Sequence, residues 1–174
     1  MNRGLVYFHF DPHHQVRDYV VTALSSLRPH ANHILLVSNS PIRDADRSRL
    51  ETCCDQVLQR PNEGLDAGAY RAGLEHLGWD RLADFDELIL TNHTCYAPLR
   101  PWEEVLTRAE GWRDISFWGM LPALSQDLKE RERIGVIARI CANLGLFSVV
   151  VAVVPATKAL GGLLGSEQLG WLAF

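Results

Sequence analysis

Side chains that could do chemistry gather in four short stretches, each directly after an apolar run. The stretches are rich in side-chain acceptors and poor in lysine and arginine. They are 9–14 (HFDPHH), 38–40 (SNS), 62–68 (NEGLDAG) and 92–94 (NHT). If the apolar runs are parallel strands, these stretches share one edge of a sheet, where open α/β folds bind ligands. A polar, hydroxyl-rich ligand fits such an edge better than a bare polyanion.

The stretch from Gly64 to Gly68 carries the most information. Both glycines permit a positive φ or a close backbone approach, and the stretch opens a helix whose free N–H groups could face a phosphate. Asp66 lies in that turn and either accepts from a ribose hydroxyl or a base, or serves only as the helix N-cap. The pattern is neither GxxxxGK[ST] nor GxGxxG, which disfavours a P-loop NTPase and a dinucleotide oxidoreductase.

The histidines suggest a metal site. His9 and Asp11 are two residues apart, face the same side of a strand and could share one ion. Only His93 is placed to add a further ligand, so a metal-dependent hydrolase built on these three residues is one hypothesis. In the alternative, Asp11 only orders its loop, and His13 and His14 are solvated.

Cysteine chemistry is disfavoured. The four cysteines, Cys53, Cys54, Cys95 and Cys141, show no CxxC spacing, which argues against a zinc knuckle or a disulfide framework. Cys95 follows His93 closely and could form a Cys–His nucleophile, although neighbours on one loop rarely hold that geometry. No GxSxG motif is present for acyl transfer.

Strands and helices alternate along the first 120 residues. Apolar, β-branched runs predict five strands, at 4–10, 34–37, 56–58, 87–90 and 115–118. Periodicity and capping signals predict helices over 16–27 and 44–53, one that starts after the 61–70 loop and ends near 78, and one opened by Pro101. This order predicts an α/β fold with an open, mostly parallel sheet and helices on both faces.

Residues 121–174 differ from residues 1–120 in charge and in apolar content. This difference predicts one domain over residues 1–120, followed by a divergent apolar tail over residues 121–174. Residues 134–154 contain three clearly polar side chains. Either this segment contacts or spans a membrane, with Arg139 near its charged end, or it forms a buried helix followed by a strand at 148–154.

Composition excludes several classes of protein. The chain has 174 residues, 47% of them hydrophobic, with 17 Lys+Arg against 21 Asp+Glu and a net charge of −4. These values argue against disorder and against a duplex nucleic-acid binder, which would show a basic face. The N-terminus runs directly into a strand, unlike a signal peptide, so a cytoplasmic location is expected.

Several stretches in order resemble one family. They are VYFHFD at 6–11, LVSNS at 36–40, NEGLDAGAY at 62–70, FDELILTN at 85–92 running on to YAPL at 96–99, and FWG at 117–119. Over about residues 5–120 the chain resembles the rhamnan synthesis protein F family, glycosyltransferase-like bacterial proteins of surface-polysaccharide assembly.

The resemblance implies a fold and an activity. The fold is a GT-A-like, Rossmann-like α/β domain that binds a nucleotide sugar, typically dTDP-rhamnose. The activity is transfer of the sugar to a glycan or lipid-linked acceptor, as in rhamnan or lipopolysaccharide synthesis. The protein would work in the cytoplasm, peripheral to or anchored at the inner face of the cell membrane.

The resemblance also implies a binding site. Its nucleotide-sugar-binding residues map to His9, Asp11, Ser38, Asn39, Asn62, Gly64, Asp66, Gly68 and Asn92. Among them, Asp11 and Asn39 would lie near the base. The group from Asn62 to Gly68 would lie near the ribose and phosphates.

The chain departs from the family at two places. The family usually reads Asn-Asp-Ser where this chain has Asn92-His93-Thr94, the position that commonly holds Mg²⁺ or Mn²⁺ on the diphosphate. His93 would then be the metal ligand, although histidine suits softer metals than Mg²⁺. After residue 119 the resemblance ends, and no general base is assigned. The alternative function is an inactive or truncated nucleotide-sugar-binding module, held to a membrane or partner by its tail.

Overall fold

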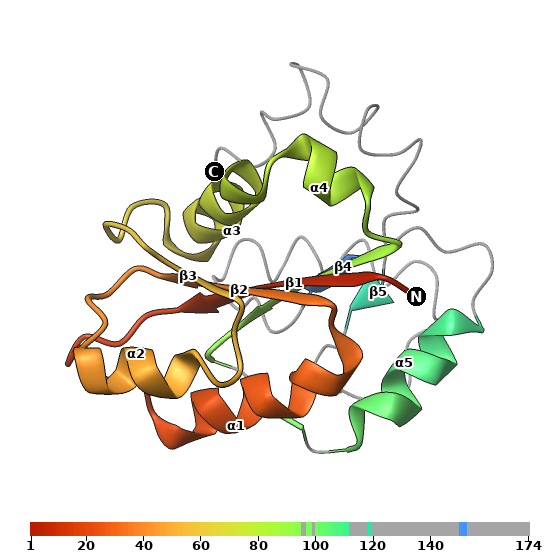
Figure 1. Ribbon diagram of the computed structural model, residues 1–174, viewed down its shortest axis with the longest axis horizontal. Helices are drawn as coiled ribbons and strands as arrows, with labels where there is room; N and C mark the ends of the chain where they lie inside the picture. Colours follow the sequence, from red (N-terminus) through yellow and green to blue (C-terminus); the bar gives the residue numbers. More distant parts are fainter. Residues whose placement is uncertain (95–96, 99, 112–117, 120–149, 153–174) are drawn as a thin grey trace, which may run out of the picture.

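The computed structural model describes residues 1–94, 97–98, 100–111, 118–119 and 150–152 (Figure 1). Its elements in chain order are β1 (Arg3–His9), α1 (Asp18–Leu27), the 3₁₀ helix η1 (Arg28–His30), β2 (His33–Ser38), α2 (Asp44–Leu50), β3 (Gln56–Gln59), α3 (Leu65–Leu77), α4 (Trp79–Ala83), β4 (Glu87–Asn92), α5 (Trp102–Glu110), β5 (Trp118–Gly119) and β6 (Val150–Ala152). The alternation of strands and helices predicted from the sequence is confirmed over the described part of the chain.

One sheet runs through the molecule in the order β3-β2-β1-β4-β6-β5. The first four strands in that order are parallel, whereas β6 pairs antiparallel with β4 and with β5. Val6 in β1 lies opposite Leu35 of β2 and Leu90 of β4. The chain moves from β1 outward to β2 and β3, then returns to the other side of β1 as β4. The strand order therefore reverses between β1 and β4, and such sheets bind ligands outside the carboxyl ends of the strands at this switch point.

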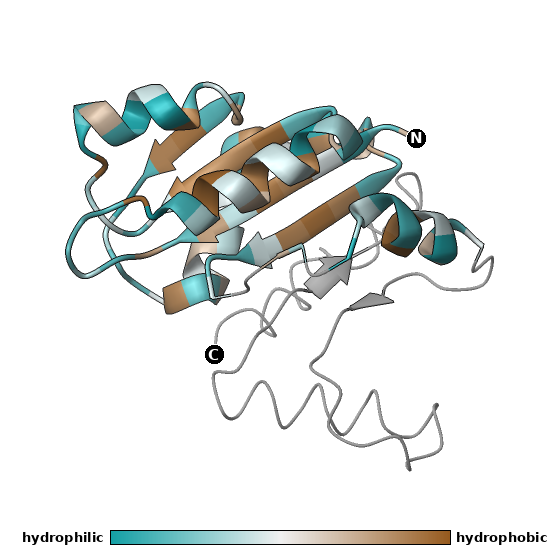
Figure 2. Ribbon diagram, turned by 90° about the horizontal axis from the view of Figure 1, so that it is seen from below, coloured by the Kyte–Doolittle hydropathy of each residue, from teal (hydrophilic) through white to brown (hydrophobic). Residues whose placement is uncertain are grey.

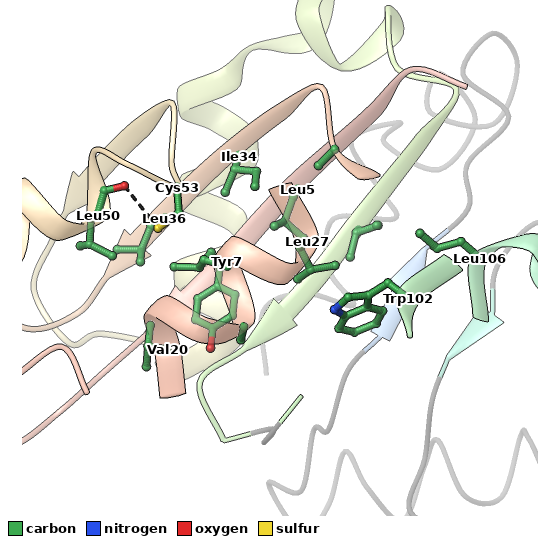
Figure 3. Close-up of a cluster of buried hydrophobic side chains, with 14 of the residues drawn as sticks. Leu5, Tyr7, Val20, Leu27, Ile34, Leu36, Leu50, Cys53, Trp102 and Leu106 are labelled. Carbon is green, nitrogen blue, oxygen red and sulfur yellow. Dashed lines mark hydrogen bonds between the residues drawn. The ribbon is translucent and has the colours of Figure 1, made fainter. Parts of the chain in front are cut away.

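One face of the sheet packs against α1, α2 and α5. Alternate strand residues such as Leu5, Ile34 and Leu36 are fully buried there, because side chains alternate between the two faces of a strand. Figure 3 shows Val20 and Leu27 of α1 in this cluster. Burying each such side chain contributes about 1.5–3 kcal/mol to the stability of the fold. This packing fixes the strands, and with them the positions of the strand ends.

The opposite face packs against α3 and α4 (Figure 1). Val6 and Val37 supply the strand residues, and Ala69 and Leu77 supply the α3 side. With both faces covered, the central strands are apolar along most of their length, as the colouring in Figure 2 shows. This pattern is typical of parallel sheets.

The boundaries of several elements differ from the prediction. The helix predicted over 44–53 ends at Leu50, where tighter i→i−3 bonds from the N–H groups of Thr52 and Cys53 to the Arg49 and Leu50 carbonyls replace the regular helical pattern. The short α4 was not predicted. This helix begins directly after Gly78, because the φ of +78° and ψ of 153° at that residue end α3.

Most of the predicted tail lies outside the described residues. Within it, Val150–Ala152 forms β6, inside the range 148–154 where one of the two interpretations places a strand. Of the strand predicted at 115–118, the structure describes residue 118, which begins β5. In the described part of the chain, no helix has the length and apolarity needed to cross a bilayer.

Candidate functional site

The stretches that follow β1, β2 and β4 lie together at the carboxyl edge of the sheet. The His9 Nδ1 atom is 3.0 Å from Ser38 Oγ, and the Asn39 N–H donates to the His9 carbonyl at 2.9 Å. The His93 N–H donates to the carbonyl of Phe8 at 2.9 Å. These three stretches are therefore neighbours, as predicted from the sequence.

Asn39 joins the fourth stretch to the other three. Its side-chain Nδ2 donates to Asn62 Oδ1 at 2.9 Å and to the Leu65 carbonyl at 3.1 Å. Its Oδ1 accepts from Arg60 Nη1 at 2.9 Å. Asn39 itself is only 5% exposed, and these partly buried bonds link the end of β2 to the start of α3.

The first turn of α3 has an unusual backbone. Gly64 is the N-cap with φ +69°, and Leu65 also has a positive φ, of +50°. No side chain caps the helix, and Asp66 Oδ1 accepts from the neighbouring Ala67 N–H at 2.9 Å. The interpretation of Asp66 as the N-cap is therefore wrong. Its half-buried carboxylate remains at the rim, where it suits a hydroxyl donor.

Gly68 is required for a close backbone contact. A Cβ atom at this position would lie 2.2 Å from the Glu63 carbonyl oxygen, and the Gly68 N–H donates to the Gly64 carbonyl at 2.7 Å. No residue with a side chain fits without moving the backbone. The glycine thus lets the loop before α3 fold tightly onto the first turn of the helix.

Asp11 orders its own loop. Its Oδ1 accepts from the His13 N–H at 2.7 Å, and its Oδ2 accepts from Arg17 Nε at 3.2 Å. Partial burial opposes ionisation, but the His13 N–H and the Arg17 guanidinium together hold the pKa of this carboxyl below its usual range. The Asp11 N–H donates to Ser40 Oγ at 2.7 Å, which ties the loop after β1 to the end of β2.

His9 and His93 form a neutral pair beneath the edge. Burial, reinforced by the nearby His93, lowers the pKa of His9 to about 4. Burial likewise lowers the pKa of His93. The ring centroids of the two histidines are 5.8 Å apart, and the His93 ring also meets Phe8 edge-on at 5.5 Å. Both imidazoles are therefore uncharged at neutral pH.

The donor set at this edge does not fit a magnesium ion. Both ring nitrogens of His9 lie within hydrogen-bond distance of protein oxygens, Nδ1 on Ser38 and Nε2 on the Gln15 carbonyl at 3.3 Å. Asn92 Oδ1 accepts from the Thr94 hydroxyl at 2.7 Å. Among the described residues, no three His, Cys, Asp or Glu side chains lie close enough to hold an ion. Mg²⁺ prefers several oxygen ligands, so this geometry supports neither the hydrolase hypothesis nor a role for His93 in holding magnesium.

Three arginines at this edge were missed by the sequence reasoning. Arg17 pairs with Asp11, Arg43 Nη2 donates to the His13 carbonyl at 2.8 Å, and Arg60 Nη2 donates to the Glu63 carbonyl at 2.8 Å. They escaped notice because each lies outside the four stretches. Arg60 gave one usable signal, since it directly follows the last residue of β3. The edge is therefore richer in cationic side chains than the sequence indicated.

Two curated proteins match a short part of the chain. The chain is 35% identical over 65 residues to the raffinose carrier protein of Pediococcus pentosaceus, and 41% identical over 69 residues to the lactose permease of Lactobacillus delbrueckii subsp. bulgaricus. Each match covers 36% of this chain and 10% of the relative, so the chain spans about a tenth of their length.

One solved structure that matches is core-mannan synthase A from Aspergillus fumigatus in its Mn/GDP form. It is 7% identical, with a TM-score of 0.41, and the match covers 99% of this chain and 63% of that chain. A likeness at this level supports no conclusion about function.

A stronger match is to a protein family. Residues 34–136, more than half of the chain, match the family described as rhamnan synthesis protein F. That range contains the ends of β2 and β3, the turn that opens α3, and β4 with the stretch after it. Because this match covers more than half of the chain and includes these elements of the sheet edge, the chain belongs to the rhamnan synthesis protein F family.

Proposed function

We propose that this chain is the nucleotide-sugar-binding part of a glycosyltransferase of bacterial surface-polysaccharide synthesis. The observation that carries the proposal is the Asn39 network in a member of this family. It joins the loops after β2 and β3 to the first turn of α3 at the carboxyl edge of a parallel sheet. Residues 1–120 form the GT-A-like domain, and the donor is dTDP-rhamnose.

The side chains at this edge contact different parts of the donor according to their charge. Asp66 and Asn62 at the rim offer oxygen acceptors to the hydroxyl groups of the ribose or sugar. Arg60 and the N-terminal N–H groups of α3 face the diphosphate, because both carry positive charge or partial charge. Asp11 and Asn39, each held by hydrogen bonds, fix the loops beside the base.

The reaction is attack by an acceptor hydroxyl on the anomeric carbon of the donor. The new bond joins the acceptor oxygen to that carbon, the bond to the diphosphate oxygen breaks, and the proton of the acceptor hydroxyl is released to water. Negative charge grows on the leaving nucleoside diphosphate, and Arg60 stabilises it there. The acceptor is a glycan or lipid-linked sugar at the cytoplasmic face of the membrane.

The donor site is tested by calorimetric titration of the full chain with dTDP, dTDP-rhamnose and UDP-glucose. Selective micromolar binding of the dTDP ligands is expected, and Arg60→Gln should weaken it at least tenfold. Arg71→Gln is the matched control, because Arg71 lies on the exposed side of α3 and pairs there with Glu75. Equal binding by both variants and the wild-type chain, or no binding at all, would contradict the proposal.

Two further arms separate the finer alternatives. Titrations with and without Mn²⁺, repeated on His93→Ala, test whether a metal strengthens donor binding, since a ligand role for His93 requires Mn²⁺-strengthened binding that the variant loses. Incubation with radiolabelled dTDP-rhamnose and a lipid-linked glycan extract then measures transfer. Tight binding without transfer would favour the inactive binding module over the enzyme.

A further inference from the structure

Leu65, the first residue of α3, has a side chain that does not suit its backbone conformation. Its φ is +50°, and in the described part of the chain His14 is the only other residue besides glycine with a positive φ. A Cβ atom crowds the backbone in this left-handed region, which glycine and asparagine adopt more readily than a bulky residue such as leucine. The hydrogen bond from Asn39 Nδ2 to the Leu65 carbonyl, 3.1 Å long, holds the turn. This bond explains the backbone conformation, but it does not explain why the residue is leucine.

The side chain of Leu65 gains little from the core of the protein. It is 64% exposed, and neither hydrophobic cluster of the described residues includes it. An apolar side chain that stays in water forgoes the stabilisation that burial would supply. Leu65 therefore combines a strained backbone with exposed apolar surface, and packing within the described part of the chain offsets neither. Residues that carry such strain concentrate at ligand-binding sites.

Leu65 lies at the edge of the sheet where the donor is proposed to bind. Its carbonyl is bonded to the Asn39 side chain, and the Asn39 N–H donates to the His9 carbonyl at the end of β1. The next residue, Asp66, is half-buried at the same rim. An exposed apolar side chain thus stands among the polar groups of this edge, an arrangement that suits a ligand with both polar and apolar parts.

The base is the part of a nucleotide sugar that Leu65 suits. The ribose and the diphosphate are polar, and Asp66 and Arg60 offer hydrogen-bonding partners for them. A pyrimidine base has apolar faces, and thymine also carries a C5 methyl group that uracil lacks. The function proposed above places Asn39 at the loops beside the base, and the Leu65 carbonyl is bonded directly to Asn39.

We propose that Leu65 contacts the C5 methyl group of thymine and so gives the donor site a preference for thymidine over uridine nucleotides. This inference rests on the function proposed above and names the residue that recognises the base. Removing one methyl-sized group from water changes an affinity by about fourfold, so this contact produces a preference of that size.

The experiment is calorimetric titration of the full chain with dTDP and dUDP, which differ only in the C5 methyl group. The wild-type chain should bind dTDP about fourfold more tightly than dUDP. Leu65→Asn keeps nearly the same side-chain shape but makes it polar, so this variant should bind the two nucleotides equally. Leu65→Met keeps an apolar side chain and should retain the preference.

Trp79→Gln is the matched control. Trp79 is also a large exposed apolar side chain, 48% exposed, but it lies beyond the other end of α3, about 20 Å along the helix from Leu65. Its replacement removes apolar surface from the protein without touching the carboxyl edge of the sheet. This variant should therefore bind dTDP more tightly than dUDP by the same factor as the wild-type chain.

A purely structural role for Leu65 predicts a different pattern. If the side chain only shaped the turn, Leu65→Asn would weaken dTDP and dUDP binding by the same factor and leave their ratio unchanged. Thermal unfolding gives a second readout. Asparagine adopts a φ of +50° more readily than leucine, so the variant should unfold at the same temperature as the wild-type chain or at a higher one. A lower unfolding temperature with an unchanged ratio would overturn the inference.

The outcomes separate this inference from the proposed function. Binding of dTDP without a preference over dUDP, or with a preference that Leu65→Asn keeps, would overturn the inference and leave the donor site in place. If Leu65→Asn instead lost only the discrimination between dTDP-rhamnose and dTDP-glucose, Leu65 would contact the sugar, and its assignment to the base would be wrong. A folded chain that binds no nucleotide would overturn both proposals.

Discussion

At the scale of single residues, Asn39 is the side chain on which the carboxyl edge depends most. Its buried amide connects Arg60, Asn62 and the Leu65 backbone through three partly buried hydrogen bonds. The sequence indicated Asn39 as a binding residue. It could not show that the side chain also holds the positive-φ turn at Leu65, because this contact crosses 26 residues of chain.

Replacing Asn39 should therefore affect stability as well as binding. Asn39→Ala removes three hydrogen bonds and leaves the Leu65 carbonyl without that donor, which should lower the free energy of unfolding by about 2 kcal/mol. Urea denaturation measures the change. Arg71→Gln, which breaks only an exposed pair, should stay within about 0.5 kcal/mol of the wild-type chain. Equal stability of both variants would show that the network contributes little.

His9 makes stability depend on pH. Its pKa of about 4 in the folded chain lies below the usual 6.5, so the unfolded chain binds the proton more readily between these values. The free energy of unfolding should fall by about 3 kcal/mol as the pH is lowered from 6.5 to 4, with His33 and His93 acting in the same direction. Denaturation at several pH values measures the slope. His9→Gln should flatten it, and an unchanged slope in that variant would contradict the account.

At the scale of elements, the start of α3 shows what a sequence can and cannot predict. The apolar runs and helical spacings located every strand of the parallel part of the sheet and the helices α1, α2, α3 and α5 within a few residues. The glycines marked the turn before α3. The structure confirms the two roles predicted for them, since Gly64 has a positive φ and Gly68 makes a close backbone approach. Which group Gly68 approaches, the Glu63 carbonyl, is a contact that no spacing rule reveals.

Gly68→Ala tests the geometry of that turn. The new Cβ would meet the Glu63 carbonyl oxygen at 2.2 Å, so the turn must move, at a cost of about 3 kcal/mol. Gly111→Ala is the control, because Gly111 has an ordinary φ of −72° and should change stability by less than about 1 kcal/mol. Thermal unfolding compares the two. A Gly68→Ala protein as stable as Gly111→Ala would mean that the turn is loosely packed.

At the scale of the whole molecule, topology explains why four separated stretches meet. The order β3-β2-β1-β4 places their carboxyl ends side by side, which the alternating pattern predicted. The arginines at this edge were beyond prediction. Arg17 and Arg43 lie just before α1 and α2, Arg60 follows β3, and their partners come from other loops, so no periodic pattern reveals them. The helix α4 is likewise too short to leave a periodic signal.

The central claim is that a nucleotide sugar binds at the carboxyl edge. Hydrogen–deuterium exchange of the full chain with and without dTDP-rhamnose tests it directly. Protection should appear in peptides covering residues 9–14, 38–40 and 60–70, while residues 80–86 at the opposite edge stay unchanged. Protection confined to 80–86, or none at saturating ligand, would contradict the claim.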